Sequence, residues 1–268
     1  MADSPRKPLK PTAPRLKARK GTGEKIVCLT AYDAVTGALA DEAGADLILV
    51  GDSVGNVVLG FSSTVPVTLP MMVHHVAAVR RGVSRALVVG DLPFGSYNQS
   101  VAQAVESGVA LLQAGAEAVK LEGDYPEAVA ALVKAGIPVM GHLGFTPQSV
   151  NTFGGHRVQG RDDEAADLIL AQADRLAEAG VFAIVLELMP ADLAARLTRR
   201  LPVPTIGIGA GSGCDGEIQV FHDVVGLSEK SYKHARAFVQ ARALLSQGLT
   251  EYVIAVREGR FPTEENSF

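Results

Sequence analysis

The sequence has little cysteine, no long apolar run and no leader-like beginning, and each absence excludes a class of protein. Only Cys28 and Cys214 occur in 268 residues. Two cysteines make neither a disulfide framework nor a zinc cluster, so a reducing, cytoplasmic setting is expected. No apolar run approaches the roughly 18 residues that cross a bilayer, so we expect no membrane span. No N-terminal segment has the apolar centre of a signal peptide.

The charge is distributed unevenly along the chain. The net charge is −4, but residues 1–25 carry eight Lys or Arg against two acids, a net of +6, which leaves −10 for the other 243 residues. Prolines recur at positions 5, 8, 11 and 14, a spacing that favours an extended arm. The segment has no aromatic residue to stack on bases. We therefore predict a basic arm over residues 1–11 and no nucleic-acid partner; a nucleic-acid-binding tail and a transit peptide are the alternatives.

Eight short apolar runs recur along the chain. They are continuously apolar rather than alternating, which indicates strands buried on both faces, as in a parallel sheet. The runs span residues 26–29, 47–50, 86–90, 118–121, 137–141, 183–187, 204–208 and 218–221.

Helical patterns separate these runs, and several end in Ala-Gly just before the next strand. The expected helices span residues 33–44, 100–115, 125–136, 163–180, 191–200 and 230–247. Eight buried strands alternating with helices predict an α/β fold, a single-domain (β/α)8 TIM barrel over residues 12–268, with a short N-terminal helix or arm before the first strand. A doubly wound open sheet is the alternative.

Carboxylates stand where four of the expected strands end. The second, third, fourth and sixth strands lead to Asp52, Asp91, Glu122 and Glu187. Because the carboxyl ends of barrel strands meet at one rim, these residues would share a site. Four carboxylates at one mouth repel each other unless a cation or a proton intervenes. Oxygen ligands without a Cys or His cluster favour Mg²⁺ over zinc.

Three more polar residues accompany the carboxylates. Ser53 directly follows Asp52, and His142 follows the fifth strand. Lys120 lies two residues before Glu122, so both side chains point to the same face of their strand. A lysine inside a barrel is costly to bury unless it meets an anion, so Lys120 is expected among the carboxylates.

Helix capping is the competing explanation for Asp52, Ser53 and Asp91, because Asp and Ser are preferred caps. However, Asp91 precedes Leu-Pro-Phe, and Asp52 begins a long connection over residues 52–70. Neither opens an obvious helix. A second long connection covers residues 142–161, and long connections in compact domains are usually functional. A ligand-binding rim is therefore favoured.

Other candidates are weaker. His142 could be a core histidine, and the GIGAG stretch beginning at residue 207 could either cradle phosphate or pack closely. His74 and His75 are read as helix-surface or interface residues. Cys28 is read as core, and Cys214 has no identifiable base nearby.

Several motifs together resemble one enzyme family. The stretches LILVGDSVGN, GDLPFGSY, AVKLEG, GHLGFTPQSVN, IVLELMPA and PTIGIGAGSG occur in order between about residues 12 and 227. In that order they resemble ketopantoate hydroxymethyltransferase. The chain departs from the family pattern at His156, at Glu217 and after Leu227.

The resemblance implies transfer of a hydroxymethyl group from 5,10-methylenetetrahydrofolate to 3-methyl-2-oxobutanoate. The product is 2-dehydropantoate, in pantothenate biosynthesis, formed through a Mg²⁺-stabilised enolate. It also implies a cytoplasmic homo-oligomer, typically a decamer.

The same resemblance implies roles for individual residues. Asp52 and Asp91 would bind Mg²⁺, and Glu122 would complete the metal site through water. Ser53 and Lys120 would hold the oxo acid beside the metal-binding aspartates, with His142 close to the reacting groups. Glu187 would be the catalytic base.

Two other functions compete with this interpretation. A Mg²⁺-dependent 2-oxo acid lyase or mutase of the phosphoenolpyruvate mutase type would chelate its substrate at a similar rim. A non-catalytic barrel that acts as a scaffold would need none of these residues for chemistry.

Overall fold

The computed structural model describes residues 9–229 and 232–268. The chain divides into two compact units, residues 1–220 and 221–268. Most of the expected N-terminal arm, residues 1–8, lies outside the described residues, as do residues 230 and 231 of the last expected helix.

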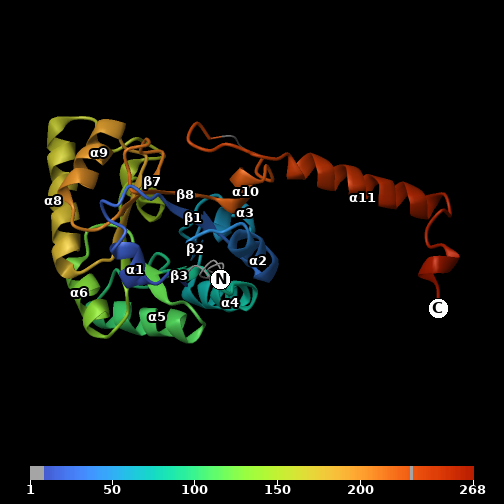
Figure 1. Ribbon diagram of the computed structural model, residues 1–268, viewed down its shortest axis with the longest axis horizontal. Helices are drawn as coiled ribbons and strands as arrows, with labels where there is room; N and C mark the ends of the chain where they lie inside the picture. The colour runs from blue at the N-terminus through green and yellow to red at the C-terminus, as the bar shows by residue number, and fades with distance from the viewer. Residues whose placement is uncertain (1–8, 230–231) are drawn as a thin grey trace, which may run out of the picture. The chain divides into compact units, whose positions relative to one another are not determined.

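The first unit is a closed barrel of eight parallel strands in sequence order (Figure 1), which confirms the predicted fold. The strands are β1 (Ile26–Thr30), β2 (Leu47–Val50), β3 (Leu87–Asp91), β4 (Ala118–Lys120), β5 (Val139–Gly144), β6 (Ala183–Glu187), β7 (Thr205–Ile208) and β8 (Gly216–Gln219).

Strand β8 begins two residues before the predicted run because Gly216 lets the barrel close. A Cβ at Gly216 would lie 2.4 Å from the carbonyl oxygen of Ile26 and 2.8 Å from Ile206. Gly216 pairs with both of these neighbouring residues, so only glycine fits between β1 and β7. A search for apolar runs passes over Gly216 and Glu217.

Helices connect and surround the strands. Those of the barrel unit are α1 (Ala13–Lys17), α2 (Ala34–Glu42), α3 (Val54–Val57), α4 (Leu69–Gly82), α5 (Val101–Gln113), α6 (Pro126–Lys134), η1 (Pro147–Ser149), α7 (Val150–Phe153), α8 (Asp163–Ala179) and α9 (Ala191–Arg200). The second unit has α10 (Phe221–Val224), α11 (Ala241–Arg257) and η2 (Glu264–Asn266).

Side-chain caps explain where several helices begin. Asp33 accepts a hydrogen bond from the N–H of Thr36 and closes a capping box at the start of α2. Ser100 accepts from the N–H of Gln103 at the start of α5. Both satisfy donors that a helix leaves unpaired at its first turn.

The bounds of the helix predicted for residues 230–247 are wrong, because α11 begins only at Ala241 and continues to Arg257. The preceding residues bond to the segment that ends α10 instead of to their own helix. The N–H of Phe238 donates to Val224, and the N–H of Ala241 donates to Val225. Among the helices of the described residues, none is long and apolar enough to cross a membrane.

Two layers of apolar side chains hold the barrel together. Outward-facing strand residues pack against the helices and form the larger core. Inward-facing residues fill the barrel: Ile26, Cys28, Leu47, Leu49, Leu87, Val89, Ala118, Met140, Ala183, Val185, Ile206, Ile208 and Ile218.

Helix α1 closes the amino end of the barrel. Ala13 and Leu16 belong to the same apolar cluster as the inward-facing strand residues. The turn after α1 makes ion pairs with acids that directly precede strands: Arg19 with Asp46 before β2, at 2.9 Å, and Lys20 with Asp215 before β8, at 2.8 Å. The opposite, carboxyl end is left for the site.

Asp41 of α2 anchors the segment that leads into β3. Its carboxylate accepts from the N–H groups of Ser84, Arg85 and Ala86 and from the Ser84 hydroxyl, at 2.6–3.2 Å. Burial opposes the charged form, but these donors outweigh it and lower the pKa of Asp41.

Candidate functional site

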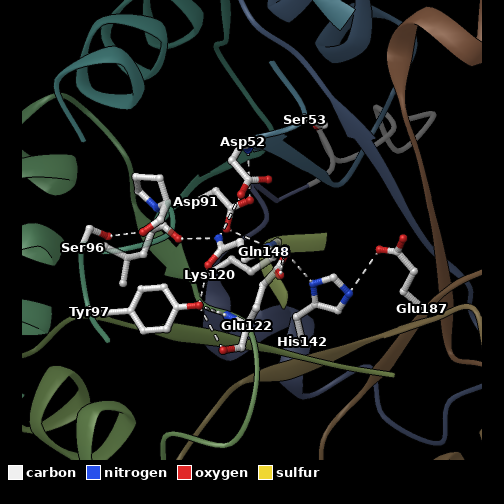
Figure 2. A network of polar contacts seen from close by, with 12 residues as sticks. Asp52, Ser53, Asp91, Ser96, Tyr97, Lys120, Glu122, His142, Gln148 and Glu187 are labelled. Atoms are coloured by element: carbon white, nitrogen blue, oxygen red, sulfur yellow. Dashed lines mark hydrogen bonds and ion pairs between the residues drawn. The ribbon is translucent and has the colours of Figure 1, made fainter. Parts of the chain in front are cut away.

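Polar side chains at the carboxyl end of the barrel continue the rows of inward-facing apolar residues. Along β3, Leu87 and Val89 face inward, and the next inward position is Asp91. A strand turns alternate residues to the same face, so the last inward position of each strand lies at the carboxyl end. The residues that this alternation brings there are Asp91, Lys120, His142 and Glu187 (Figure 2).

Asp52 and Ser53 stand in the turn after β2, and the capping explanation is wrong for Ser53. Ser53 occupies the N-cap position of the short helix α3 but makes no side-chain cap. Its Oγ instead lies 2.8 Å from the hydroxyl of Tyr32, which follows β1. The backbone N–H of Asp52 donates to Oδ2 of Asp91 at 3.2 Å, so the two aspartates lie side by side.

Lys120 is buried among carboxylates, as its spacing from Glu122 predicts. Its side chain is 4% exposed, and Nζ lies 2.7 Å from Oδ1 of Asp91 and 3.4 Å from Oε1 of Glu122. Burial opposes the ammonium form, but these two anions outweigh it and raise the pKa of Lys120. Lys120 is therefore a permanent cation at the centre of the site.

His142 lies between two carboxylates from neighbouring strands. Nδ1 is 3.2 Å from Oε1 of Glu122, and Nε2 is 3.2 Å from Oε2 of Glu187. Neither ring nitrogen makes a well-aligned hydrogen bond, so both contacts are those of an ion pair. Burial opposes the imidazolium, but Glu122 outweighs it and raises the pKa of His142 to about 9.

The carboxylate of Glu122 contacts three other residues of the site. Oε1 contacts Lys120 and His142, and Oε2 accepts from the backbone N–H of Gln148 at 3.0 Å. Burial opposes its charged form, but Lys120 and then His142 outweigh it, and the pKa of Glu122 falls to about 2.

Asp52 and Asp91, unlike Glu122, have raised pKa values. Burial, followed by repulsion from Asp91 and Glu122, raises the pKa of Asp52 well above its ordinary value. Burial also raises the pKa of Asp91, although Lys120 partly offsets it. A divalent cation between these two carboxylates would remove the repulsion, so the donor set fits a hard cation such as Mg²⁺.

A glycine keeps side-chain atoms away from the two aspartates. Gly51 occupies the position before Asp52, and a Cβ there would lie 2.9 Å from Ser53 Oγ and 3.8 Å from Asp91 Oδ2. Within the described residues, no group of three or more Asp, Glu, His or Cys is arranged to hold a metal by itself. A cation here would therefore need water or substrate oxygens as further ligands, which is usual for Mg²⁺.

Two residues of this network lie within the family motifs GDLPFGSY and GHLGFTPQSVN but were not singled out as site residues from the sequence. Gln148, in η1, donates to Asp52, and Tyr97, after β3, donates to Gln148. The length of the 142–161 connection indicates that it matters, but nothing singles out a neutral amide within it. Apolar runs and titratable residues do not find such partners.

Strain marks the residue after Glu187. Leu188 has φ +45°, a left-handed conformation that is uncommon for a non-glycine residue. Backbone hydrogen bonds hold it on both sides: Leu188 N–H donates to Ile208, and Gln159 N–H donates to Leu188. Leu188 thus stays bonded to β7 while its backbone leaves the extended conformation of the strand.

The GIGAG stretch is explained by packing rather than by a ligand. A Cβ at Gly211 would lie 2.5 Å from Ala191, and one at Gly213 would lie 2.9 Å from Ala195. Both glycines let the connection after β7 lie against α9.

The remaining candidates stand apart from the network. The ring of His75 bonds to the backbone oxygen of Tyr32, and His74 is exposed on α4. Cys28 and Cys214 are buried free thiols.

Comparisons with known proteins point to one family. The family model described as ketopantoate hydroxymethyltransferase matches residues 10–264. The 3-methyl-2-oxobutanoate hydroxymethyltransferase of Aeropyrum pernix is 54% identical over 259 residues, which cover 96% of this chain and 94% of the relative. The protein of the same name from Moorella thermoacetica is 53% identical over 261 residues, with 96% and 97% covered.

Solved structures share the fold at low identity. A phosphoenolpyruvate phosphomutase from Streptomyces platensis has a TM-score of 0.63 at 15% identity and covers 92% of this chain and 88% of its own. A phosphonopyruvate hydrolase in complex with oxalate and Mg²⁺ has a TM-score of 0.61 at 13% identity, with 95% and 93% covered. At such identities the likeness speaks for the barrel fold alone.

Proposed function

Because this chain belongs to the ketopantoate hydroxymethyltransferase family, we propose that it transfers a hydroxymethyl group to 3-methyl-2-oxobutanoate. The donor would be 5,10-methylenetetrahydrofolate and the product 2-dehydropantoate. The observation that supports this most strongly is the line of contacts from Asp91 through Lys120, Glu122 and His142 to Glu187. It joins a candidate cation site to a candidate base within one barrel mouth.

Asp52 and Asp91 would hold Mg²⁺, with Glu122 contributing through water. When bound, the cation would polarise the 2-oxo group of the substrate and stabilise negative charge on it. Lys120 and Ser53 would contact the substrate carboxylate and fix its orientation. Both residues are themselves held in place, Lys120 by Asp91 and Ser53 by Tyr32.

Glu187 would act as the general base that removes the proton from C3 of the oxo acid. It is the most accessible carboxylate of the network, with 16% of its side chain exposed. His142 contacts its Oε2 and would keep the carboxylate oriented. Water would break the two C–N bonds of the methylene bridge, so that the carbon keeps the water oxygen as formaldehyde and the two protons of water stay on the nitrogens of the departing tetrahydrofolate. Loss of the C3 proton to Glu187 leaves an enolate, C3 adds to this carbon, and the proton held by Glu187 returns to the oxygen, which becomes the new hydroxyl group.

Deuterium exchange at C3 of 3-methyl-2-oxobutanoate tests the base. With Mg²⁺ in D₂O, the methyl doublet in the proton NMR spectrum should collapse to a singlet as C3 loses its proton. Glu187→Gln should lower the exchange rate by about 10²-fold or more, the usual contribution of a general base. Glu178→Gln, an exposed change on α8, is the matched control. Equal exchange by Glu187→Gln and wild type would remove Glu187 from this role.

Product formation separates this function from a lyase or mutase. A hydroxymethyltransferase forms 2-dehydropantoate only when methylenetetrahydrofolate is present. A lyase or mutase of the phosphoenolpyruvate mutase type would convert a 2-oxo acid without folate. Folate-independent turnover would therefore favour that alternative.

We also propose the assembly and location that family membership implies. The catalytic region would comprise residues 12–268, with residues 1–11 as an arm. The chain would form a cytoplasmic homo-oligomer, a decamer, which sedimentation velocity would measure directly.

A further inference from the structure

Gln148 is the most completely hydrogen-bonded side chain of the site. It is 4% exposed and lies in η1, directly after the connection from β5. Nε2 is 2.9 Å from Oδ2 of Asp52 and 2.9 Å from the carbonyl oxygen of Leu92. Oε1 is 2.6 Å from the hydroxyl of Tyr97. Figure 2 shows the amide in the middle of the carboxylate cluster.

The surroundings permit only one orientation of this amide. The carbonyl of Leu92 can only accept, so the NH₂ group must face it, and its second hydrogen then points at Asp52. The Tyr97 hydroxyl accepts from the backbone N–H of Glu122 at 3.2 Å and donates to Oε1 at 2.6 Å. A flipped amide would place two acceptors against each other at Leu92.

This orientation determines how Asp52 presents its carboxylate. Oδ2 is held by Gln148, whereas Oδ1 accepts no hydrogen bond from the residues that the structure describes. A neutral donor holds the carboxylate without cancelling its charge. Asp91 differs, because its Oδ1 contacts the cationic Lys120.

We propose that Gln148 is a positioning residue of the cation site. Its side-chain amide orients Asp52, and its backbone N–H orients Glu122, so one short segment aligns two of the proposed cation-binding groups. This inference rests on the proposed function, because it needs a cation at Asp52 and Asp91. Partners that orient a ligating carboxylate typically change metal affinity 10–100-fold when removed.

Direct binding of Mn²⁺ as a probe for Mg²⁺ tests the proposal without relying on turnover. Chelator-treated full-length protein is titrated with Mn²⁺, and free Mn²⁺ is measured by electron paramagnetic resonance. Gln148→Met keeps the side-chain volume and removes the amide, and we expect Mn²⁺ to bind 10–100-fold more weakly. Gln113→Met, at an exposed position at the end of α5, should bind as wild type does.

Saturating metal separates positioning from a merely structural role. With enough Mn²⁺ to fill the site, Gln148→Met should recover C3 exchange to within about threefold of wild type, because only the affinity is impaired. Should Gln148→Met not fold, Gln148→Asn, which keeps an amide too short to reach Asp52, serves instead.

Tyr97→Phe tests whether the hydroxyl acts through the amide. It should weaken Mn²⁺ binding less than Gln148→Met, and the double variant should be weaker by less than the product of the two single effects, because residues in one network couple. If the double variant weakens Mn²⁺ binding by the full product of the two single effects, the link through Gln148 is contradicted.

Failure of this inference can be distinguished from failure of the proposed cation site. If wild type binds no Mn²⁺, the proposed cation site and this inference both fail. If wild type binds Mn²⁺ and Gln148→Met binds within twofold of it, the inference alone is overturned.

Discussion

Gly51→Ala tests whether the space beside the aspartates is kept open for a ligand. Gly51 does not adopt the positive φ that would itself require glycine. The added Cβ would lie 2.9 Å from Ser53 Oγ, closer than real Cβ atoms approach such an atom. The Ser53 hydroxyl must therefore move, and its 2.8 Å contact with Tyr32 is strained or lost.

The expected cost to stability is small. Losing one hydrogen bond costs about 1 kcal/mol. Replacing glycine by alanine restricts the unfolded chain and returns about 0.4–1 kcal/mol. The free energy of unfolding, measured by urea titration, should therefore change by less than about 1 kcal/mol.

The expected cost to catalysis is much larger. Misplacement of a substrate-positioning group by about 1 Å can lower a rate about 10²-fold. We expect kcat/KM for 3-methyl-2-oxobutanoate to fall about 10–100-fold, in the folate-coupled assay and in C3 exchange alike. Gly248→Ala, at an exposed position with no atom within 4 Å, is the control and should leave both rates unchanged. A Gly51→Ala protein with kcat/KM within twofold of wild type would refute the reasoning.

Three further changes test the electrostatics. Lys120→Met leaves Asp91 and Glu122 buried without their cation, so metal-free protein should lose about 3–5 kcal/mol in urea unfolding; a loss below 1 kcal/mol would count against the buried ion pair. Asp52→Asn relieves carboxylate repulsion, so calorimetry should find a higher metal-free Tm and no further rise with Mg²⁺, whereas wild type should gain from Mg²⁺; an unchanged Mg²⁺ response would exclude Asp52 as a ligand. The pKa of Asp41 is lower in the folded state than in the unfolded state. Its contribution to the free energy of unfolding is therefore present above the unfolded-state pKa of about 3.9 and is lost as pH falls through the folded-state pKa. Asp41→Asn should lower the free energy of unfolding by about 2 kcal/mol at pH 7, and this difference from wild type should become smaller below pH 4. A difference in stability that does not depend on pH would contradict the assignment.

The barrel and its charged residues could be predicted because both follow from local rules. A continuously apolar run identifies a strand buried on both faces, and the residue after it lies at the rim. The position of Lys120 among the carboxylates could be predicted from the two-residue period of a strand. These inferences need no knowledge of how distant segments meet.

The partners of those residues could not be predicted, because they depend on how connections fold back over the rim. Gln148 reaches Asp52 across 96 positions of sequence, and Tyr97 reaches Gln148 across 51. The sequence also does not show which backbone segments pack closely against each other. Whether the glycines after β7 serve a ligand or a neighbour could be decided only when Gly211 and Gly213 were seen against α9.

The charges of the site argue that cation and substrate bind together. His142, with a pKa of about 9, is cationic at neutral pH, as is Lys120. With all four carboxylates ionised, the network would carry −2, and burial together with repulsion from Asp91 and Glu122 raises the pKa of Asp52 and so opposes that state. A 2-oxo acid brings another negative charge, and like charges about 4 Å apart repel by roughly 4 kcal/mol at an effective dielectric constant near 20. A dication removes this repulsion and offers the oxo acid a ligand site, so it should precede or accompany the substrate. Linkage then requires the oxo acid to raise cation affinity by the same factor.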